Sequence, residues 1–441
     1  MTDIPFAASQ HAATRLPPWV EPALRHGGWF AAFLVLAPVI GPRDYGLFML
    51  ALAGVAIAEA ALAEPAATAL AHMSELDEHH WSTALLTLIG AGGMLWLASR
   101  AASGLLEALV AEPGFGELFQ PLAIVPLLGA LAVVPRAALR RDDRGTALAA
   151  ATTTALIAGG GVAVLLAWAG AWSLVAQIVV QRLVEGVLLW SIVGRQIGIG
   201  WSAAHFTDLV GALDARAFAA ASPAVSRYTA CLIVGVALGP TATGLYMLVA
   251  RLPEALTELC LAGEPLREWG AQLRHACRVA LPVALATTLL PVALPPLIDL
   301  RWWGAVLPAQ ILLLGVIPTA LLTVGTDDAG GTAARVIGGV ALMAFTARYG
   351  LPAMVATEVA WLSLPLVARF TARRRRFGAP LSTVLHEAAR PCAGAALAGA
   401  FLYFVTIPVG LTLQPVPALC LLAATAWLGY AIIRGEPRAA E

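Results

Sequence analysis

Apolar stretches near or above the length that spans a bilayer recur from end to end of this 441-residue chain. A transmembrane helix needs roughly 20 predominantly apolar residues, and the core of a soluble domain has room for only a few such segments. Charged residues make up 12% of the chain, whereas soluble domains carry about 25%. The sequence therefore predicts an all-α, polytopic membrane protein.

We predict about fourteen transmembrane helices, separated by connections that contain helix breakers such as Gly41-Pro42 and Gly239-Pro240. Their approximate ranges are 26–40, 45–70, 81–99, 117–135, 146–167, 172–194, 217–238, 244–262, 279–298, 305–325, 329–346, 351–368, 391–410 and 415–433.

The chain contains no lysine, so arginine is its only permanently cationic side chain. Alternate connections, counted from the N-terminus, hold 19 arginines. The opposite set holds four, namely Arg43, Arg100, Arg301 and Arg348. Since basic residues concentrate on the cytoplasmic side, this distribution places both termini in the cytoplasm of a multi-pass protein.

The decapeptide GPRDYGLFML at 41–50 returns 198 residues later as GPTATGLYML at 239–248, with six identical positions. Gly-Pro ends one helix, and the later glycine permits close return into the next. We therefore expect paired hinges at Gly41, Pro42, Gly46, Gly239, Pro240 and Gly244. Six predicted spans separate the copies, so the two halves have the same orientation, as in transporters built from parallel repeats.

The segment GPRDYGLFMLALA resembles the first hairpin of the polysaccharide-biosynthesis flippases. These form the O-antigen and exopolysaccharide branch of the multidrug/oligosaccharidyl-lipid/polysaccharide exporter superfamily. GPTATGLYMLVARLPEAL is similar to the matching hairpin of its second lobe, and residues 297–318 and 347–370 also fit. One departure is the acidic connection AHMSELDEHH at 71–80, where basic residues are expected.

This resemblance implies two pseudo-symmetric six-helix lobes around a central cavity, followed by two C-terminal helices. It divides the chain into a cytoplasmic N-terminal segment at 1–25, an N-lobe at 26–196, a C-lobe at 197–370, a basic cytoplasmic linker at 371–390, spans 13 and 14 at 391–433, and a cytoplasmic tail at 434–441.

Charged groups within the predicted spans are the candidate functional residues, because each costs roughly 2.5–3.5 kcal/mol to insert at bilayer depth. Arg251, Glu254 and Glu258 form one stripe on span 8, where the first lobe has Ala53, Ala56 and Ala60 at the same offset. If the two repeats are aligned with a shift of one residue, Glu59 instead becomes the counterpart of Glu258.

We assign substrate binding to Arg251, Arg227 and Arg335, and ion coupling to Glu254, Glu258 and Glu59. A guanidinium binds phosphate oxygens bidentately, and a buried carboxyl readily takes up a proton. Arg182 and Glu185, three residues apart, are interpreted as a structural ion pair. Internal Arg–Glu pairs that lock helices together remain an alternative for span 8.

Other polar groups are interpreted as solvated. Glu64 and Glu358 lie near the ends of spans. His72, His79 and His80, amid Glu75, Asp77 and Glu78, have side chains that can bind a metal, but a solvated loop is the favoured interpretation, so we predict no metal site. The sequence contains no recognisable nucleophile–base pair and indicates no cofactor, which argues against an enzyme. A net charge of zero argues against nucleic acid as a partner.

The resemblance implies a flippase of the bacterial inner membrane that translocates a polyprenyl-diphosphate-linked oligosaccharide. Its expected partners are that substrate, membrane lipids and other membrane proteins of polysaccharide assembly. One alternative is a drug/cation antiporter of the same superfamily, which would need acids in the first lobe's cavity. Another is a membrane-embedded polysaccharide polymerase or acyltransferase, which would need a large outward loop with catalytic residues.

Overall fold

The computed structural model describes Phe33 and residues 35–73, 75–193, 200–261, 299–316 and 329–377, with a few isolated positions between 284 and 319. Within these residues every regular element is a helix. Six helices are long and apolar enough to cross a membrane: Pro42–His72, Glu78–Ala108, Phe115–Arg141, Gly145–Leu165, Ala171–Val193 and Ala224–Glu258. The all-α polytopic class is therefore confirmed. The predicted spans 13 and 14 lie outside the described residues.

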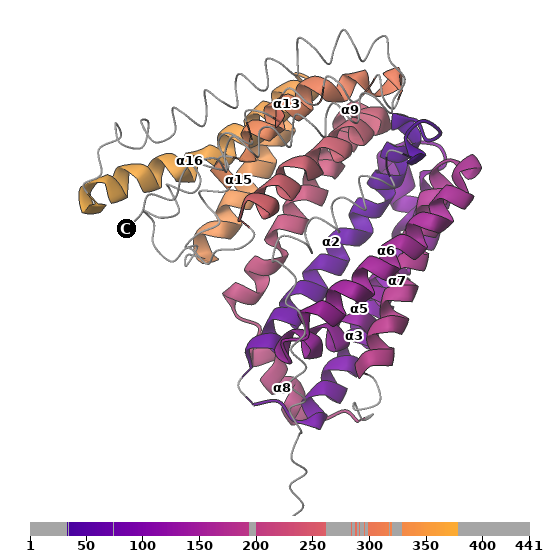
Figure 1. Ribbon diagram of the computed structural model, residues 1–441, viewed down its shortest axis with the longest axis vertical. Helices are drawn as coiled ribbons and strands as arrows, with labels where there is room; N and C mark the ends of the chain where they lie inside the picture. Colours follow the sequence, from indigo (N-terminus) through magenta and orange to yellow (C-terminus); the bar gives the residue numbers. More distant parts are fainter. Residues whose placement is uncertain are drawn as a thin grey trace, which may run out of the picture.

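The helices fall into two groups (Figure 1). The first comprises α2 (Pro42–His72), α3 (Glu78–Val110), α4 (Phe115–Leu122), α5 (Val125–Arg141), α6 (Gly145–Leu165), η1 (Ala167–Ala169) and α7 (Ala171–Val193). The second comprises α9 (Ala215–Leu261), η5 (Leu300–Ala305), α13 (Val306–Leu314), α15 (Ala329–Ala347) and α16 (Leu351–Phe377). The short helix α8 (Ala203–Gly211) lies between the groups in sequence and packs beside α3.

Helix α9 contains two spans that run in opposite directions. Gly239 has φ 82° and ψ 175°, a conformation that only glycine adopts readily. Arg227 and Glu254 lie 27 residues apart, on either side of this glycine, and form an ion pair. A continuous helix would separate them by about 40 Å at 1.5 Å per residue. The chain therefore reverses at Gly239, as the Gly-Pro signal predicts.

The two copies of the repeated decapeptide contact each other reciprocally. A Cβ atom on Gly46 would overlap the carbonyl oxygen of Pro240, and one on Gly244 would overlap that of Pro42. Only glycine allows the two backbones to approach so closely. Helices α2 and α9 accordingly form the most extensive contact between elements in the described part of the chain. The repeat thus marks the surface through which the two groups of helices meet.

Among the described residues, the hydrophobic contact between α2 and α9 involves one end of α2. Its first half, from Tyr45 to Ala56, belongs to a hydrophobic cluster that includes Cys231, Val234 and Met247 of α9. Its second half, from Ala63 to Leu70, packs in a separate cluster with residues of α3 and α5. The groups therefore join at the end that carries the Gly-Pro elements, which the arginine distribution predicts to be the outer side.

Residues of η5 add contacts at the same end of the interface between the two groups. Arg301 Nη2 donates to the carbonyl of Pro38 at 2.8 Å, and Trp302 Nε1 donates to that of Ala37 at 3.2 Å. The Trp302 ring lies edge-on against Phe33 and Tyr45, with centroid distances of 5.1 and 5.9 Å. In this conformation the predicted outer end of the interface between groups is closed.

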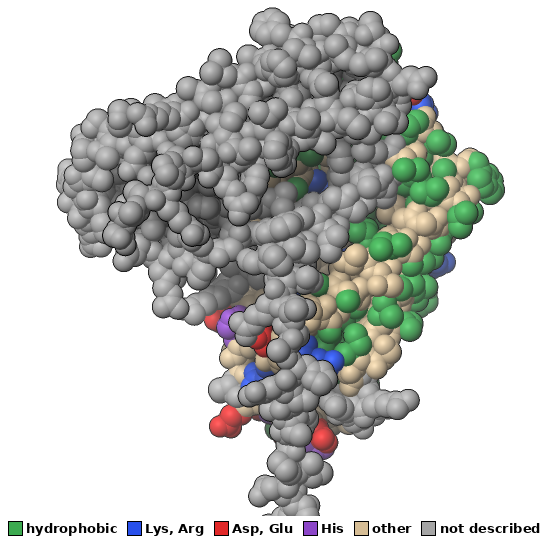
Figure 2. Space-filling view, in the orientation of Figure 1, with side chains coloured by type: hydrophobic (Ala, Val, Ile, Leu, Met, Phe, Trp, Pro, Cys, Tyr) green, Lys and Arg blue, Asp and Glu red, His purple; other side chains and the backbone are tan. Residues whose placement is uncertain are grey.

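Exposed apolar side chains cover the face formed by α6 and α7 (Figure 2). They include Ile157, Leu165 and Val187, which are exposed by 69%, 76% and 67%. A water-facing surface would carry charges at such positions. Their apolar character fits a surface that faces lipid.

Candidate functional site

Four charged side chains form a network inside the first group of helices. Arg182 on α7 contacts Glu59 on α2 at 2.8 Å and Glu185, one turn along its own helix, at 3.3 Å. Arg136 on α5 donates to Glu185 at 2.6 Å. Glu59 and Glu185 are both buried. The two acids are thus matched by two arginines, and the network ties three helices together.

The local sequence makes room for this network. Gly129 of α5 lies against Glu59, and a Cβ at this position would overlap the carboxylate. The spacing of Arg182 and Glu185 predicts their contact, and the structure places them together. It also joins Glu59 to them, although the sequence analysis assigns Glu59 to ion coupling. That role remains a prediction, now for a carboxylate that has an arginine partner.

A second charged pair lies on the hairpin of α9. Arg227, on the arm before Gly239, donates to the carboxylate of Glu254 on the arm after it. The side chains are 23% and 40% exposed, so solvent or a ligand can reach them. In the first repeat Ala56 occupies the position equivalent to Glu254, and it is buried. The pair therefore belongs to the second hairpin and not to the shared scaffold.

The Tyr246 hydroxyl connects this hairpin to α16. It donates to the two carboxylate oxygens of Glu358, at 3.1 and 3.2 Å, and the tyrosine is fully buried. The interpretation of Glu358 as a solvated group at a span end is wrong, because its carboxylate is half-buried and hydrogen-bonded. Position 246 is the one where the first repeat has Phe48, so the second copy gains the hydroxyl that reaches Glu358.

The remaining predicted residues lie on α9 and α15. Arg251 is half-buried on the arm that carries Glu254, and Glu258 on the same arm is exposed. Arg335 lies in α15, but its side chain is outside the described part of the structure. The structure thus brings Arg227 and Glu254 together, and it gives Glu254 a partner on the opposite arm of the hairpin.

Sequence reasoning missed two members of these clusters. Arg136 lies within α5 and reaches Glu185 from there. Tyr246 replaces Phe48 of the first repeat. The signal for Tyr246 was present, because a hydroxyl added at a buried position needs a hydrogen-bond partner. No local signal identifies its partner, which is 112 residues away.

Asp77, which lies outside the spans, has a clearly shifted pKa. Asp77 precedes α3 and accepts the backbone N–H of His80 at 2.8 Å, which caps the helix. This hydrogen bond, reinforced by the His80 side chain and by His205, lowers the pKa of Asp77 to about 2. The Asp77 side chain is therefore a carboxylate at neutral pH.

The fold of this chain is similar to the folds of two solved structures. The solved structure described as the lipid II flippase MurJ in an inward closed conformation aligns with a TM-score of 0.64 and 10% identity, covering 93% of this chain and 97% of that chain. An inward-facing multidrug resistance MATE transporter aligns with a TM-score of 0.59 and 14% identity, covering 84% and 96%. No curated protein sequence matches this chain.

The fold, with charged groups enclosed by apolar helices, is similar to the folds of these two structures. A family model described as polysaccharide biosynthesis protein matches residues 35–262, just over half of the sequence. The chain therefore belongs to this family of polysaccharide biosynthesis proteins, and the family resemblance stated from the sequence is confirmed.

Proposed function

We propose that this protein moves a polyprenyl-diphosphate-linked oligosaccharide from the cytoplasmic to the outer leaflet of the bacterial inner membrane. The observation that carries the proposal is the Arg227–Glu254 pair on the second hairpin. It supplies a partly exposed guanidinium within a span, at a place where the first repeat is apolar. While a lipid-linked diphosphate crosses the membrane, its anionic phosphates need a cationic partner, and this guanidinium would supply one.

The chemistry of this pair suggests how transport is driven. Arginine keeps its charge and binds phosphate oxygens through two parallel N–H donors. A diphosphate and the Glu254 carboxylate compete for the Arg227 guanidinium. Protonation of Glu254 would release that guanidinium, so proton uptake and substrate binding would favour each other. Arg251, on the same arm as Glu254, would add a second phosphate contact, with Arg335 as a third.

Alternating access would use the interface between the two groups of helices. The predicted outer end is held closed by the reciprocal glycine contacts and by Arg301 and Trp302. To release substrate outward, these contacts must separate while the opposite end closes. Because Gly46 and Gly244 let the two backbones touch at this end, their separation would be part of the opening movement.

The structure offers less support for the antiporter alternative. A cation antiporter would need accessible acids in the first lobe. The buried acids found there, Glu59 and Glu185, have arginine partners at 2.8 and 2.6 Å. A cation would have to displace an arginine that is already bound.

The test is flipping of a fluorescent polyprenyl-diphosphate oligosaccharide in proteoliposomes, followed with a membrane-impermeant quencher. We expect Arg227→Ala and Arg251→Ala to lose at least ten-fold in rate. Arg251→Lys should recover only part, since an ammonium lacks the bidentate fork. Arg43→Ala is the matched control, because Arg43 is exposed and contacts only the peripheral Glu112 among described partners.

The double variant Arg227→Ala/Glu254→Ala separates binding from structural locking. If the pair only locks the hairpin, the single variants lose folded protein and the double variant regains both stability and transport. Full transport by the double variant, normalised to folded protein, would overturn the proposed role of Arg227. Wild-type protein that moves a cationic drug but no labelled lipid would instead favour the antiporter.

A further inference from the structure

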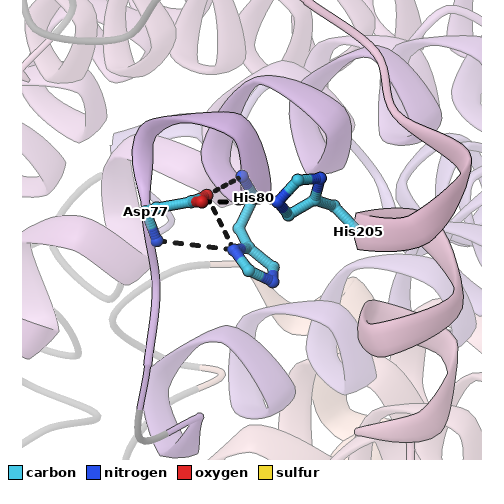
Figure 3. Close-up of side chains that lie close together, drawn as sticks. All are labelled: Asp77, His80 and His205. Carbon is cyan, nitrogen blue, oxygen red and sulfur yellow. Dashed lines mark hydrogen bonds and ion pairs between the residues drawn. The ribbon is translucent and has the colours of Figure 1, made fainter.

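Asp77, His80 and His205 converge at the predicted cytoplasmic side of the molecule (Figure 3). Asp77 and His80 belong to the start of α3, whereas His205 comes from α8. Asp77 Oδ1 lies 2.8 Å from His80 Nδ1, and Asp77 Oδ2 lies 3.3 Å from His205 Nε2. The two imidazole rings meet edge to face, with centroids 4.4 Å apart. Asp77 and His80 come from the connection predicted to be a hydrated loop, and His205 is more than 120 residues away in the sequence.

We propose that these three side chains bind a divalent transition-metal ion, with zinc as the best fit. Imidazole nitrogens with a carboxylate form the donor set that such ions prefer, whereas Mg²⁺ and Ca²⁺ prefer oxygen ligands. One ligand atom from each residue lies within 4.8 Å of the other two. In a tetrahedral zinc site with bonds of about 2.0–2.1 Å, ligand atoms stand about 3.3 Å apart. Asp77 Oδ1 and Oδ2 are already 2.8 and 3.3 Å from their histidine nitrogens.

The surroundings of His80 provide the second layer of contacts that metal-binding histidines use. A ligating imidazole usually directs its other nitrogen at a carboxylate or a carbonyl group, which fixes the ring. Here Nδ1 of His80 faces Asp77, and Nε2 lies 3.6 Å from Asp208 Oδ2. Whichever nitrogen binds the ion, the other faces a carboxylate.

His205 presents Nε2 to this cluster. Nε2 is the nitrogen that faces Asp77 Oδ2, whereas Nδ1, the other ring nitrogen, is buried and has no hydrogen-bond partner among the described residues. The ring also contacts the rings of His79 and His80. A metal ion bound through Nε2 would hold His205 beside Asp77.

The location gives the ion a structural consequence. Helix α8 precedes α9 and so lies on the connection between the two groups of helices. It docks on α3, where the backbone N–H of Ser202 donates to Thr83 Oγ1 at 3.2 Å. A metal bound by Asp77, His80 and His205 would fasten this connection to the first group. Occupancy would therefore stabilise the docked position of α8.

The test is direct zinc binding to purified full-length protein that carries no polyhistidine tag and has been stripped with a chelator. Titration against a chromophoric chelator should show one site per chain, and Co²⁺ should give the intense visible absorption of a tetrahedral complex. Asp77→Asn removes the carboxylate but keeps a side chain that caps α3. We expect Asp77→Asn and His205→Gln each to weaken zinc binding at least ten-fold.

His72→Gln is the matched control. His72 belongs to the same connection, but its Nδ1 contacts Thr68 O of its own helix and it is not part of the cluster. It should leave zinc affinity unchanged, and zinc should raise the melting temperature of this variant and of wild type but not that of the two site variants. Absence of a stoichiometric site, or equal affinity in wild type and both site variants, would overturn the proposal. These readouts do not involve transport, so they stand apart from the proposed function.

Discussion

Gly46 lies in direct contact with the backbone of Pro240, at the position where its own hairpin crosses the hairpin of the second repeat. The mirror contact, Gly244 against Pro42, makes the relationship reciprocal. Two sequence copies that touch in this way act as the two halves of one interface. Each glycine is needed because the opposing backbone occupies the space of a side chain.

Replacing Gly46 by alanine should therefore destabilise the closed interface. Overpacking a tight contact costs typically 1–3 kcal/mol, so we expect a lower melting temperature in thermal unfolding of the detergent-solubilised protein. Gly54→Ala on the same helix is the control, because its added Cβ would lie at an ordinary 3.6 Å from Phe119. Equal melting temperatures for the two variants would contradict the assigned contact.

Tyr246→Phe tests the hydrogen bond to Glu358. The substitution restores the residue of the first repeat and keeps the ring, but it leaves a half-buried carboxylate without this donor. Hydrogen bonds to charged groups contribute about 1.5–3 kcal/mol, and we expect a loss of that order in unfolding free energy. Tyr349→Phe is the control, since Tyr349 is 66% exposed.

Glu358→Gln separates hydrogen bonding from charge at the same position. The amide oxygen still accepts the Tyr246 hydroxyl, so this variant should retain more stability than Tyr246→Phe. If Glu358→Gln unfolds at the lower temperature of the two, the charge of Glu358 has a partner other than Tyr246. Thermal unfolding under identical detergent conditions gives this comparison.

The features that the sequence predicts are those with a local or repeating signature. Apolar length predicts the membrane class, the Gly-Pro pattern predicts the reversal at Gly239, and three-residue spacing predicts the Arg182–Glu185 contact. What it does not predict depends on helices that meet only in the folded protein. Arg136 on α5 contacts Glu185 on α7, and His205 on α8 contacts Asp77 at the start of α3. No local pattern encodes such contacts.

The predicted orientation can be tested by labelling single cysteines with a membrane-impermeant reagent. Gly145 and Ala169 lie at opposite ends of the span formed by α6 and η1. We expect Gly145→Cys to react only from the cytoplasm and Ala169→Cys only from outside. Gly378 and Gln414, which lie outside the described residues, should report cytoplasm and exterior respectively. Labelling of Gly145 and Ala169 from the same side would show that the span count is wrong.

The charge network of the first group gives the sharpest test of structural pairing. Arg182→Met would leave Glu59 without its 2.8 Å partner in a buried position and would leave Glu185 with Arg136 alone. Removing one member of a buried pair costs about 3–5 kcal/mol, because the remaining charge is uncompensated. We therefore expect a marked loss of folded, monodisperse protein. Glu59→Gln alone should also destabilise the folded protein, because Arg182 would lose one of its two carboxylate partners.

The double variant Glu59→Gln/Arg182→Met removes both charges and should recover most of the lost stability, because replacing a buried pair by neutral groups is often tolerated. The coupling energy from the two single variants and the double variant measures the interaction itself. If the effects are additive, Glu59 and Arg182 do not form the pair described here. If Glu59→Gln keeps full stability but loses transport, Glu59 has the ion-coupling role that the sequence predicts. The ion pair with Arg182 would then be one state of the transport cycle.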